Sequence, residues 1–134
     1  MVEAARSGKK PSFIIAIVED HADTRDWMRT CLQEEFLVST HETARDLLAF
    51  ISRNHCDLIL SDISLPDMNG YELLASIRSN PDLSHLPVIA TSAHFTESDC
   101  EKACRAGFDE SLAKPIDLDR LFAAIKSFLS GRIE

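Results

Sequence analysis

Five polar side chains follow predicted buried strands and could together carry out chemistry. Glu19 and Asp20 come directly after one apolar run, Asp62 after another, and Ser92 and Lys114 after two more. In open sheets of alternating strands and helices, ligands collect outside the carboxyl ends of the strands, where these side chains would meet. Three carboxylates at one rim repel one another unless a hard cation that prefers oxygen ligands, such as Mg²⁺, neutralises them. The set therefore predicts a magnesium site.

Each of these residues also has an ordinary explanation when it is taken alone. A single carboxylate after a strand is commonly a helix cap or a solvated loop residue, and a lysine at a strand end is commonly a solvated charge. The joint position of the five residues at one rim is what favours a functional site. If the carboxylates repel one another, replacing Asp20 or Glu19 with alanine should raise the stability of the metal-free fold.

The elements that would position this rim alternate between short apolar strands and helices with one apolar face. The predicted strands cover residues 13–18, 36–40, 57–61, 87–91 and 108–113. The predicted helices cover a segment around Trp27 up to about Glu35, residues 43–53, a segment starting at Tyr71, and two segments that follow Thr96 and Asp117. Thr96 and Asp117 are predicted to cap the last two helices, which should end at Gly107 and Gly131.

The strict alternation of strands and helices predicts the fold class. Parallel strands need crossover connections, and strands that are apolar on both sides need helices on both faces of the sheet. A closed barrel would need eight such units, and the chain offers five. The sequence therefore predicts an α/β fold with an open, doubly wound, five-stranded parallel sheet and helices on both faces. Periodicity leaves the order of the strands open.

Length and composition indicate one globular domain. The chain has 134 residues, and 45% of them are hydrophobic, which is enough for a single core. Residues 1–12 are polar and contain Ser-Gly-Lys-Lys-Pro. We therefore predict a flexible leader or linker over 1–12 that lies outside the fold, a folded domain over 13–131 and a tail over 132–134.

Charge and cysteine content argue against several classes of protein. With 22 acidic residues against 14 basic ones, the formal net charge is -8, which argues against a nucleic-acid partner. The longest apolar run, residues 13–18, is too short to span a membrane, so no membrane partner is predicted. The four cysteines lack the spacing of a secreted disulfide scaffold, which favours a reducing, cytoplasmic location. Cys100 and Cys104 make a poor zinc set without a further nitrogen or sulfur ligand.

Four motifs resemble the receiver domain of two-component response regulators. They are Glu19-Asp20, Asp62 within LILSDISLPDMNGYELL, Ser92-Ala93 after VIAT, and Lys114-Pro115 within LAKP. The resemblance extends over about residues 13–130 and takes in every strand and helix unit in order. It implies a flavodoxin-like sheet with the strand order 2-1-3-4-5, as in chemotaxis-type receivers.

The resemblance assigns a role to each carboxylate. Asp62 is implied to be the phosphoacceptor, since a carboxylate can form an acyl phosphate by attack on a phosphohistidine or a small phosphodonor. Asp20 is implied to ligate Mg²⁺ directly, and Glu19 through water or by its longer arm. Asp62 and the main-chain carbonyl of Ser64 complete the implied ligand set. Glu19 stands where the family often has aspartate, and its arm is one methylene longer.

The remaining motifs are implied to bind the phosphoryl group and to respond to it. Lys114 would bind a phosphoryl oxygen as a point charge. Ser92 resembles the switch hydroxyl, which moves to form a hydrogen bond with the phosphoryl group. The Lys114–Pro115 bond is a candidate cis peptide, because only bonds before proline make that form inexpensive. Asn69 and Gly70 supply a turn beside the acceptor.

One departure from the family and two histidines bear on how such a site is regulated. The family usually has tyrosine or phenylalanine three residues before the site lysine, and here that residue is Ser111. A serine cannot fill the pocket of an aromatic ring, so we expect coupling to the output face to be weaker or to run through Phe95 or Phe108. His21 is expected to be a solvated loop residue. His94, two residues after the switch serine, could order or exclude the water that hydrolyses an acyl phosphate.

The predicted function is that of a signalling module and not of an enzyme acting on a diffusible substrate. It takes a phosphoryl group onto Asp62 from a histidine kinase or a histidine phosphotransfer protein and loses it by slow autodephosphorylation. The phosphoryl group changes its affinity for a downstream protein partner, or acts on an output domain absent from this chain. The sequence fits a stand-alone receiver as well as a segment of a hybrid kinase or a larger regulator.

Two other classes of protein fit the motifs less well. A phosphatase of the haloacid dehalogenase type needs a second acid two residues after its nucleophilic aspartate, and this chain has Ser64 there. A flavin-binding flavodoxin needs a hydroxyl-rich phosphate loop after the first strand. This chain offers Glu19, Asp20 and His21 at that place, and the two carboxylates would repel a phosphate.

Overall fold

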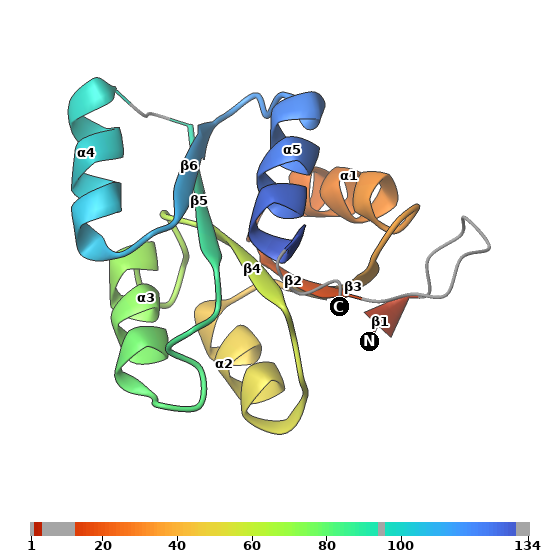
Figure 1. Cartoon of the computed structure of the whole chain (residues 1–134), viewed down its shortest axis with the longest axis horizontal. Helices are drawn as coiled ribbons and strands as arrows, with labels where there is room; N and C mark the ends of the chain where they lie inside the picture. Colours follow the sequence, from red (N-terminus) through yellow and green to blue (C-terminus); the bar gives the residue numbers. More distant parts are fainter. Residues whose placement is uncertain (1, 4–12, 94–95, 131–134) are drawn as a thin grey trace.

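Short strands alternate with helices and form one sheet that has helices packed on both faces (Figure 1). The computed structural model describes residues 2–3, 13–93 and 96–130. The parallel strands are β2 (Ile14–Val18), β3 (Leu37–His41), β4 (Leu58–Asp62), β5 (Val88–Ser92) and β6 (Glu110–Ala113). The helices are α1 (Ala22–Leu32), α2 (Ala44–Arg53), α3 (Gly70–Ser79), α4 (Glu97–Ala106) and α5 (Leu118–Leu129).

The order of the strands brings their carboxyl ends to one edge of the sheet. The parallel strands lie side by side as β3-β2-β4-β5-β6, which is the order 2-1-3-4-5 when they are numbered along the chain. The predicted α/β fold and the strand order implied by the resemblance are therefore confirmed. The register pairs Asp62 with Thr91, and Ser92 with Ala113. The last residues of β4, β5 and β6 consequently meet at the same rim.

A sixth, very short strand corrects the prediction for the N-terminal segment. β1 (Val2–Glu3) pairs antiparallel with β3, with Val2 opposite Ser39 and Glu3 opposite Val38. Without β1, β3 would be an edge strand whose backbone N–H and C=O groups lack partners on one side. The prediction that residues 1–12 lie outside the fold is therefore wrong for residues 2–3. The rest of that leader, the predicted helix end at Gly131 and the predicted tail lie outside the described residues.

Two hydrophobic cores flank the sheet and hold the rim in place. One lies between the sheet and α2, α3 and α4, and the other between the sheet and α1 and α5 (Figure 1). Successive residues of a strand face opposite sides: Ala16 and Val18 belong to the first core, and Ile15 and Ile17 to the second. Burying a side chain of the size of valine or isoleucine contributes about 1.5–3 kcal/mol. The strands are thus fixed from both sides.

The predicted helix caps are present near the rim. Thr96 accepts a hydrogen bond from the amide of Asp99 and so caps α4, and α4 ends at Gly107 in the left-handed conformation, with φ 115°. Asp117 accepts hydrogen bonds from the first turn of α5. The first helix begins earlier than its apolar pattern indicates, at Ala22, because the polar residues of its first turn carry no apolar stripe.

The start of α3 packs directly against the end of β4. Asn69 and Glu72 form a reciprocal capping box, which fixes the first turn of the helix. A Cβ atom on Gly70 would lie 2.8 Å from the Cα atom of Ile63 and 2.9 Å from the carbonyl oxygen of Asp62. Any side chain at Gly70 would therefore push the helix away from the strand end. Glycine is required here by close approach and not by a left-handed backbone.

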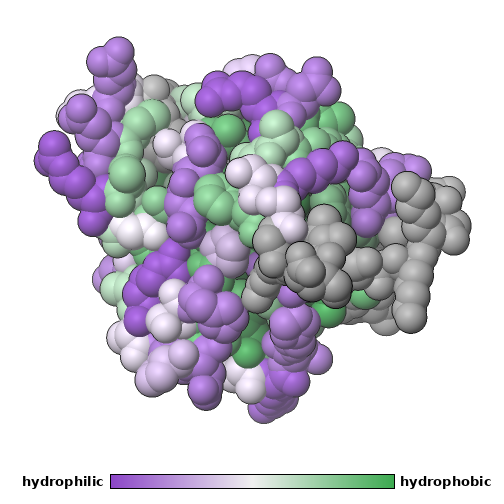
Figure 2. Space-filling model, in the orientation of Figure 1, coloured by the Kyte–Doolittle hydropathy of each residue, from purple (hydrophilic) through white to green (hydrophobic). Residues whose placement is uncertain are grey.

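Hydrophilic side chains cover much of the face shown in Figure 2, with hydrophobic ones exposed between them. Among the large apolar side chains of the described residues, Trp27 of α1 stands out because 42% of it is exposed. Within the described ranges, no helix is long and apolar enough to cross a membrane.

Candidate functional site

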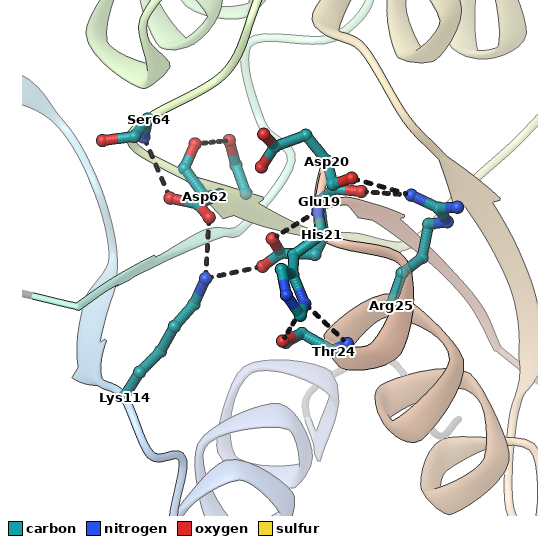
Figure 3. A network of polar contacts seen from close by, with 9 residues as sticks. Glu19, Asp20, His21, Thr24, Arg25, Asp62, Ser64 and Lys114 are labelled. Atoms are coloured by element: carbon teal, nitrogen blue, oxygen red, sulfur yellow. Dashed lines mark hydrogen bonds and ion pairs between the residues drawn. The ribbon is translucent and has the colours of Figure 1, made fainter.

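Asp62 lies at the centre of the candidate site, at the last position of β4. The residue is only 5% exposed, and both of its carboxylate oxygens have hydrogen-bond donors (Figure 3). Oδ2 accepts from the amine of Lys114 at 2.7 Å, and Oδ1 accepts from the backbone amide of Ser64 at 2.9 Å. One donor comes from the end of β6 and the other from the loop that follows Asp62. The carboxylate is therefore held from two directions.

Lys114 joins the carboxylates of two different strands. Its amine also donates to Oε1 of Glu19 at 2.8 Å, so it bridges Glu19 after β2 and Asp62 at the end of β4 (Figure 3). The other oxygen of Glu19 accepts from the backbone amide of His21 at 3.1 Å. Glu19 is 1% exposed, and a buried carboxylate is stable only when it is paired and hydrogen-bonded. One ammonium group is thus shared by two buried carboxylates, and its single positive charge balances only one of them.

Burial and the mutual contacts shift the acid–base equilibria of this pair. Burial raises the pKa of Glu19 above its usual 4.5, and the nearby charge of Asp62 adds to this, while the hydrogen bonds from Lys114 and His21 oppose it. Burial alone would lower the pKa of Lys114, but its hydrogen bonds to Asp62 and Glu19 outweigh burial and raise that pKa. The amine therefore stays protonated, and the carboxylates compete for one cation.

Asp20 adds a third carboxylate on the open side of the site. Oxygen atoms of Glu19, Asp20 and Asp62 all lie within 4.8 Å of one another, and Asp20 is exposed while the other two are buried. These are hard oxygen donors, the ligands that Mg²⁺ prefers, and a single ammonium does not balance their charge. The residues therefore fit a divalent magnesium ion. Among the described residues, no other group of three acidic, histidine or cysteine side chains converges in this way.

The predicted residues line one shared cavity of about 370 Å³. Its walls include the three carboxylates and Lys114, together with Ser64 and Ser92. The carbonyl of Ser92 accepts from the amide of Lys114 at 2.9 Å, which ties the end of β5 to the end of β6. The Lys114–Pro115 peptide is cis, as the resemblance implies. The structure thus brings all six predicted site residues together, although what each one does remains a prediction.

Sequence reasoning missed two residues that fix the backbone of the site. Arg25 of α1 donates to the carbonyl oxygens of Glu19 at 2.9 Å and Asp20 at 3.4 Å, which holds the turn after β2 (Figure 3). Asp67 accepts from the amides of Ala44 and Arg45 at 3.0 and 2.8 Å, which ties the loop after β4 to the start of α2. Slight burial would raise the pKa of Asp67, but backbone hydrogen bonds outweigh it and lower that pKa.

The histidines and the aromatic candidates fall into different places. His21 is exposed, as expected, but it also caps α1 by accepting from the amide of Thr24, and it lines the cavity. His94 and Phe95 lie outside the described residues. Phe108 is 4% exposed and packs edge to face against Tyr71, with ring centroids 5.6 Å apart. Phe108 is thus a core residue on the side of α3 and α4. Ser111 is half-buried on β6.

The fold and the acidic rim define a doubly wound α/β domain with a candidate cation site at the carboxyl ends of its parallel strands. A family model described as the response regulator receiver domain matches residues 15–126. The chain therefore belongs to the response regulator receiver domain family, as its motifs predict, and this family functions in two-component signalling.

Similar proteins include an uncharacterized protein, a response regulator and the receiver domain of a histidine kinase. The chain is 35% identical over 115 residues to an uncharacterized 14.6 kDa protein of Leptolyngbya boryana. The aligned region covers 85% of this chain and 88% of that protein. It is 32% identical over 120 residues to the polar-differentiation response regulator DivK of Brucella ovis, and the aligned region covers 86% of this chain and 94% of DivK. The signal receiver domain of a histidine kinase from Syntrophus aciditrophicus has a TM-score of 0.82 and 30% identity, with 90% and 92% covered.

Proposed function

We propose that this chain accepts a phosphoryl group on the carboxylate of Asp62 and so switches its affinity for a protein partner. The observation that carries the proposal is the position of Asp62: its Oδ2 lies 2.7 Å from the amine of Lys114, inside a group of three carboxylates that approach within 4.8 Å. The same residues line an open cavity, so a phosphoryl donor has access to them. The phosphoryl group comes from a phosphohistidine of a histidine kinase or a phosphotransfer protein.

Transfer requires one bond to form as another breaks. An oxygen of Asp62 attacks the phosphorus, the phosphorus–nitrogen bond of the phosphohistidine breaks, and the imidazole leaves and takes up a proton. Charge on the transferring group is spread over its oxygens, so positioned positive charge lowers the barrier more than covalent help does. Asp62 is suited to attack because the amide of Ser64 orients one of its oxygens.

Glu19, Asp20 and Asp62 would hold Mg²⁺ together with the main-chain carbonyl of Ser64. Bound there, the ion neutralises charge on the carboxylates and on the transferring group. Lys114 supplies a further positive charge. In the unphosphorylated site its amine donates a hydrogen bond to Asp62. The amine is close enough to donate instead to an oxygen of the new acyl phosphate. The chain's own residues thus bind and orient the group, and they release it only slowly by hydrolysis.

Ser92 is the proposed switch residue. It lies at the end of β5, is half-buried, and lines the same cavity as Asp62. A hydroxyl group that turns toward a new phosphoryl oxygen gives that acceptor one donor. Because the carbonyl of Ser92 accepts from the amide of Lys114, a shift there would move the ends of β5 and β6 together. Because residue 111 is a serine, no aromatic ring at that position would change its place in response to this movement.

The proposed docking place for the phosphodonor protein lies beside the cavity. A second cavity of about 300 Å³ is lined by Trp27, Pro115 and Ile116, and it shares Thr24 and Lys114 with the first. Exposed tryptophan beside an apolar hollow is typical of residues that contribute most to a protein interface. A helical surface seated there would bring its phosphohistidine to Asp62. We place this exchange in the cytoplasm, in keeping with four cysteines that form no disulfide.

Intact-mass measurement after treatment with acetyl phosphate and Mg²⁺ tests the proposal. We expect a gain of one phosphoryl group, which hydroxylamine removes because acyl phosphates react with it. Asp62→Asn should abolish the gain, whereas Asp23→Asn, an exposed carboxylate close to the same rim, should leave it unchanged. The proposal is wrong if Asp62→Asn still gains a phosphoryl group that hydroxylamine removes, or if the unaltered chain gains none.

A further inference from the structure

A second polar cleft lies at the opposite end of the sheet from Asp62. It has a volume of about 200 Å³ and is formed by the loop between α2 and β4 and the loop between α3 and β5. Both loops lie at the lower end of the molecule in Figure 1, where the strands begin. His55 lines the cleft from the first loop, and Asp82 and His85 line it from the second. The proposed phosphorylation does not involve these residues.

The donor atoms of this cleft differ in kind from those of the acidic rim. The rim offers carboxylate oxygens, whereas the cleft offers two imidazole rings and one carboxylate, with the buried thiol of Cys56 beside them. Imidazole nitrogen favours Zn²⁺ and its neighbours in the first transition row over Mg²⁺. A ligand set with two nitrogens and one oxygen from two loops therefore points to a different metal.

His55 has a carboxylate partner on one of its two ring nitrogens. Its Nε2 lies 2.9 Å from Oδ1 of Asp57, although the ring itself is 67% exposed. Asp57 is 8% exposed at its side chain, and its Oδ2 accepts from the amide of Ile14 at 2.9 Å. A carboxylate only accepts hydrogen bonds, so Nε2 is the donor in this contact, and in the neutral ring Nδ1 keeps the lone pair that a metal ion needs. A carboxylate behind a histidine is the usual outer partner of a metal-ligating imidazole.

In the second loop, hydrogen bonds from Arg78 fix the backbone on both sides of His85. Arg78 of α3 donates to the carbonyl oxygens of Ser84 at 3.2 Å and Leu86 at 2.6 Å. The amide of Asp82 donates to the side chain of Asn80 at 2.9 Å. The loop is therefore fixed, while the side chains of Asp82 and His85 are exposed and can turn. In the described part of the chain, only the acidic rim has three donor atoms within 4.8 Å, so binding at the cleft requires these side chains to turn toward His55.

We propose that this cleft binds a divalent transition-metal ion of the Zn²⁺ type. Nδ1 of His55, a ring nitrogen of His85 and the carboxylate of Asp82 are its ligands, and water completes the coordination. An ion held by both loops ties the end of α2 to the end of α3. Binding to the folded state alone stabilises the fold in proportion to the ion's affinity and concentration.

Calorimetric titration with Zn²⁺ tests this site. The titration uses the full chain carrying Asp62→Asn, in excess Mg²⁺, so that the acidic rim does not compete. We expect one Zn²⁺ per chain and a higher melting temperature on binding. Loss of even an outer partner typically costs about 10–100-fold in metal affinity, so His55→Ala and His85→Ala should each weaken binding by at least about tenfold.

Asn54→Ala is the matched control, since Asn54 lines the same cleft but is not in the proposed ligand set. It should retain the affinity and the rise in melting temperature. Far-ultraviolet circular dichroism checks that each variant is folded before titration. The proposal is overturned if His55→Ala and His85→Ala, each made in the chain that carries Asp62→Asn, bind Zn²⁺ as tightly as that chain does without them. It is also overturned if the chain with Asp62→Asn alone shows neither binding heat nor a rise in melting temperature.

Discussion

Two polar clusters in this domain combine buried side chains with an exposed aspartate, and they differ in whether their buried polar atoms remain accessible to a ligand. In the first, Ser39 Oγ lies 2.6 Å from His41 Nε2, and His41 Nδ1 lies 2.7 Å from Asp46 Oδ2. This is the connectivity of a serine nucleophile, a histidine base and an aspartate. Yet Ser39 has no solvent exposure, and the ring of Phe50 packs on His41 at 4.9 Å. No substrate can reach the hydroxyl, so the cluster is a closed structural network.

The second cluster is the acidic rim, which is also buried but stays open on one side. Glu19 and Asp62 are nearly as inaccessible as Ser39, but they share one lysine and line a cavity with the exposed Asp20. Their negative charge is not balanced, and the cavity gives a cation or a phosphoryl group access. Hydrogen-bond connectivity alone therefore does not mark a functional site. Access and uncompensated charge distinguish the rim from the closed network.

The largest expected effect comes from removing the lysine that holds the rim together. Lys114→Ala leaves Glu19 and Asp62 without their cation, and we expect it to suppress phosphorylation by acetyl phosphate by at least about a hundredfold. Because the amine is partly exposed, we expect the free energy of unfolding in metal-free buffer to fall by roughly 1–3 kcal/mol. Urea unfolding and intact mass measure the two effects.

Added Mg²⁺ should restore part of the stability lost in Lys114→Ala, because a second cation can replace the first. Lys126→Ala, which removes an exposed lysine of α5 that pairs with Glu35 at 3.3 Å, is the control. It should leave phosphorylation unchanged and lower the free energy of unfolding by less than about 1 kcal/mol, as is usual for an exposed ion pair. Unchanged phosphorylation in Lys114→Ala would contradict the proposed role of the rim.

Replacing Trp27 distinguishes an effect on docking of the phosphodonor protein from an effect on phosphoryl transfer itself. Trp27→Ala should slow transfer from a phosphohistidine protein by about thirtyfold, since tryptophans that anchor interfaces contribute about 2 kcal/mol. Phosphorylation by acetyl phosphate should be unchanged, because the small donor makes no use of that surface. The rates of both reactions are compared by gel mobility of the phosphorylated chain. Equal slowing with both donors would show that Trp27 acts on the site itself.

Asp20 tests whether charge is uncompensated at the rim. Asp20→Ala should weaken Mg²⁺ binding by about tenfold and leave metal-free stability unchanged or slightly higher, because it removes a repelling charge. The sequence alone predicts the same gain for Glu19→Ala. The structure does not support that second expectation, since Glu19 is buried and bonded to Lys114. Calorimetry and urea unfolding decide, and unchanged Mg²⁺ affinity in Asp20→Ala would contradict the proposed ligand set.

The smallest expected effect concerns the closed network and pH. Burial lowers the pKa of His41 below 6.5, against the opposing hydrogen bond to Asp46. As pH falls through the unfolded value of about 6.5, the unfolded chain takes up a proton that the folded chain does not. The contribution of His41 to stability is therefore complete above that pH and is lost as pH falls toward the lower folded pKa.

Urea midpoints at pH 7.5 and 5.5 measure this effect in the unaltered chain and in His41→Gln. The unaltered chain should lose more stability than the variant between the two pH values. His85→Gln, which removes an exposed imidazole, should behave like the unaltered chain. If His41→Gln and the unaltered chain lose the same stability, His41 does not account for the pH dependence.

Sequence analysis predicted features that depend on local order along the chain. The five strands follow from short apolar runs, and the caps at Thr96 and Asp117 follow from residues that accept hydrogen bonds at helix starts. The strand order and the cis bond before Pro115 needed the resemblance to a family, because periodicity carries no information on either.

Contacts between distant parts of the chain were beyond sequence reasoning. Arg25 donates hydrogen bonds to two backbone carbonyl oxygens. Every residue has a backbone carbonyl, so the types of residue in the sequence do not show which ones Arg25 contacts. The bond between Lys114 and Glu19 joins residues 95 positions apart, so their pairing depends on the strand order. β1 is only two residues long, too short for any periodic pattern.

The most direct test of the central claim is to locate the phosphoryl group within the chain. The chain is treated with acetyl phosphate and Mg²⁺ and then with borohydride, which reduces an aspartyl phosphate to homoserine, and the peptides are sequenced by mass spectrometry. We expect homoserine at position 62 alone, and none when Mg²⁺ is removed by a chelator. Homoserine at another aspartate, with Asp62 intact, would contradict the central claim.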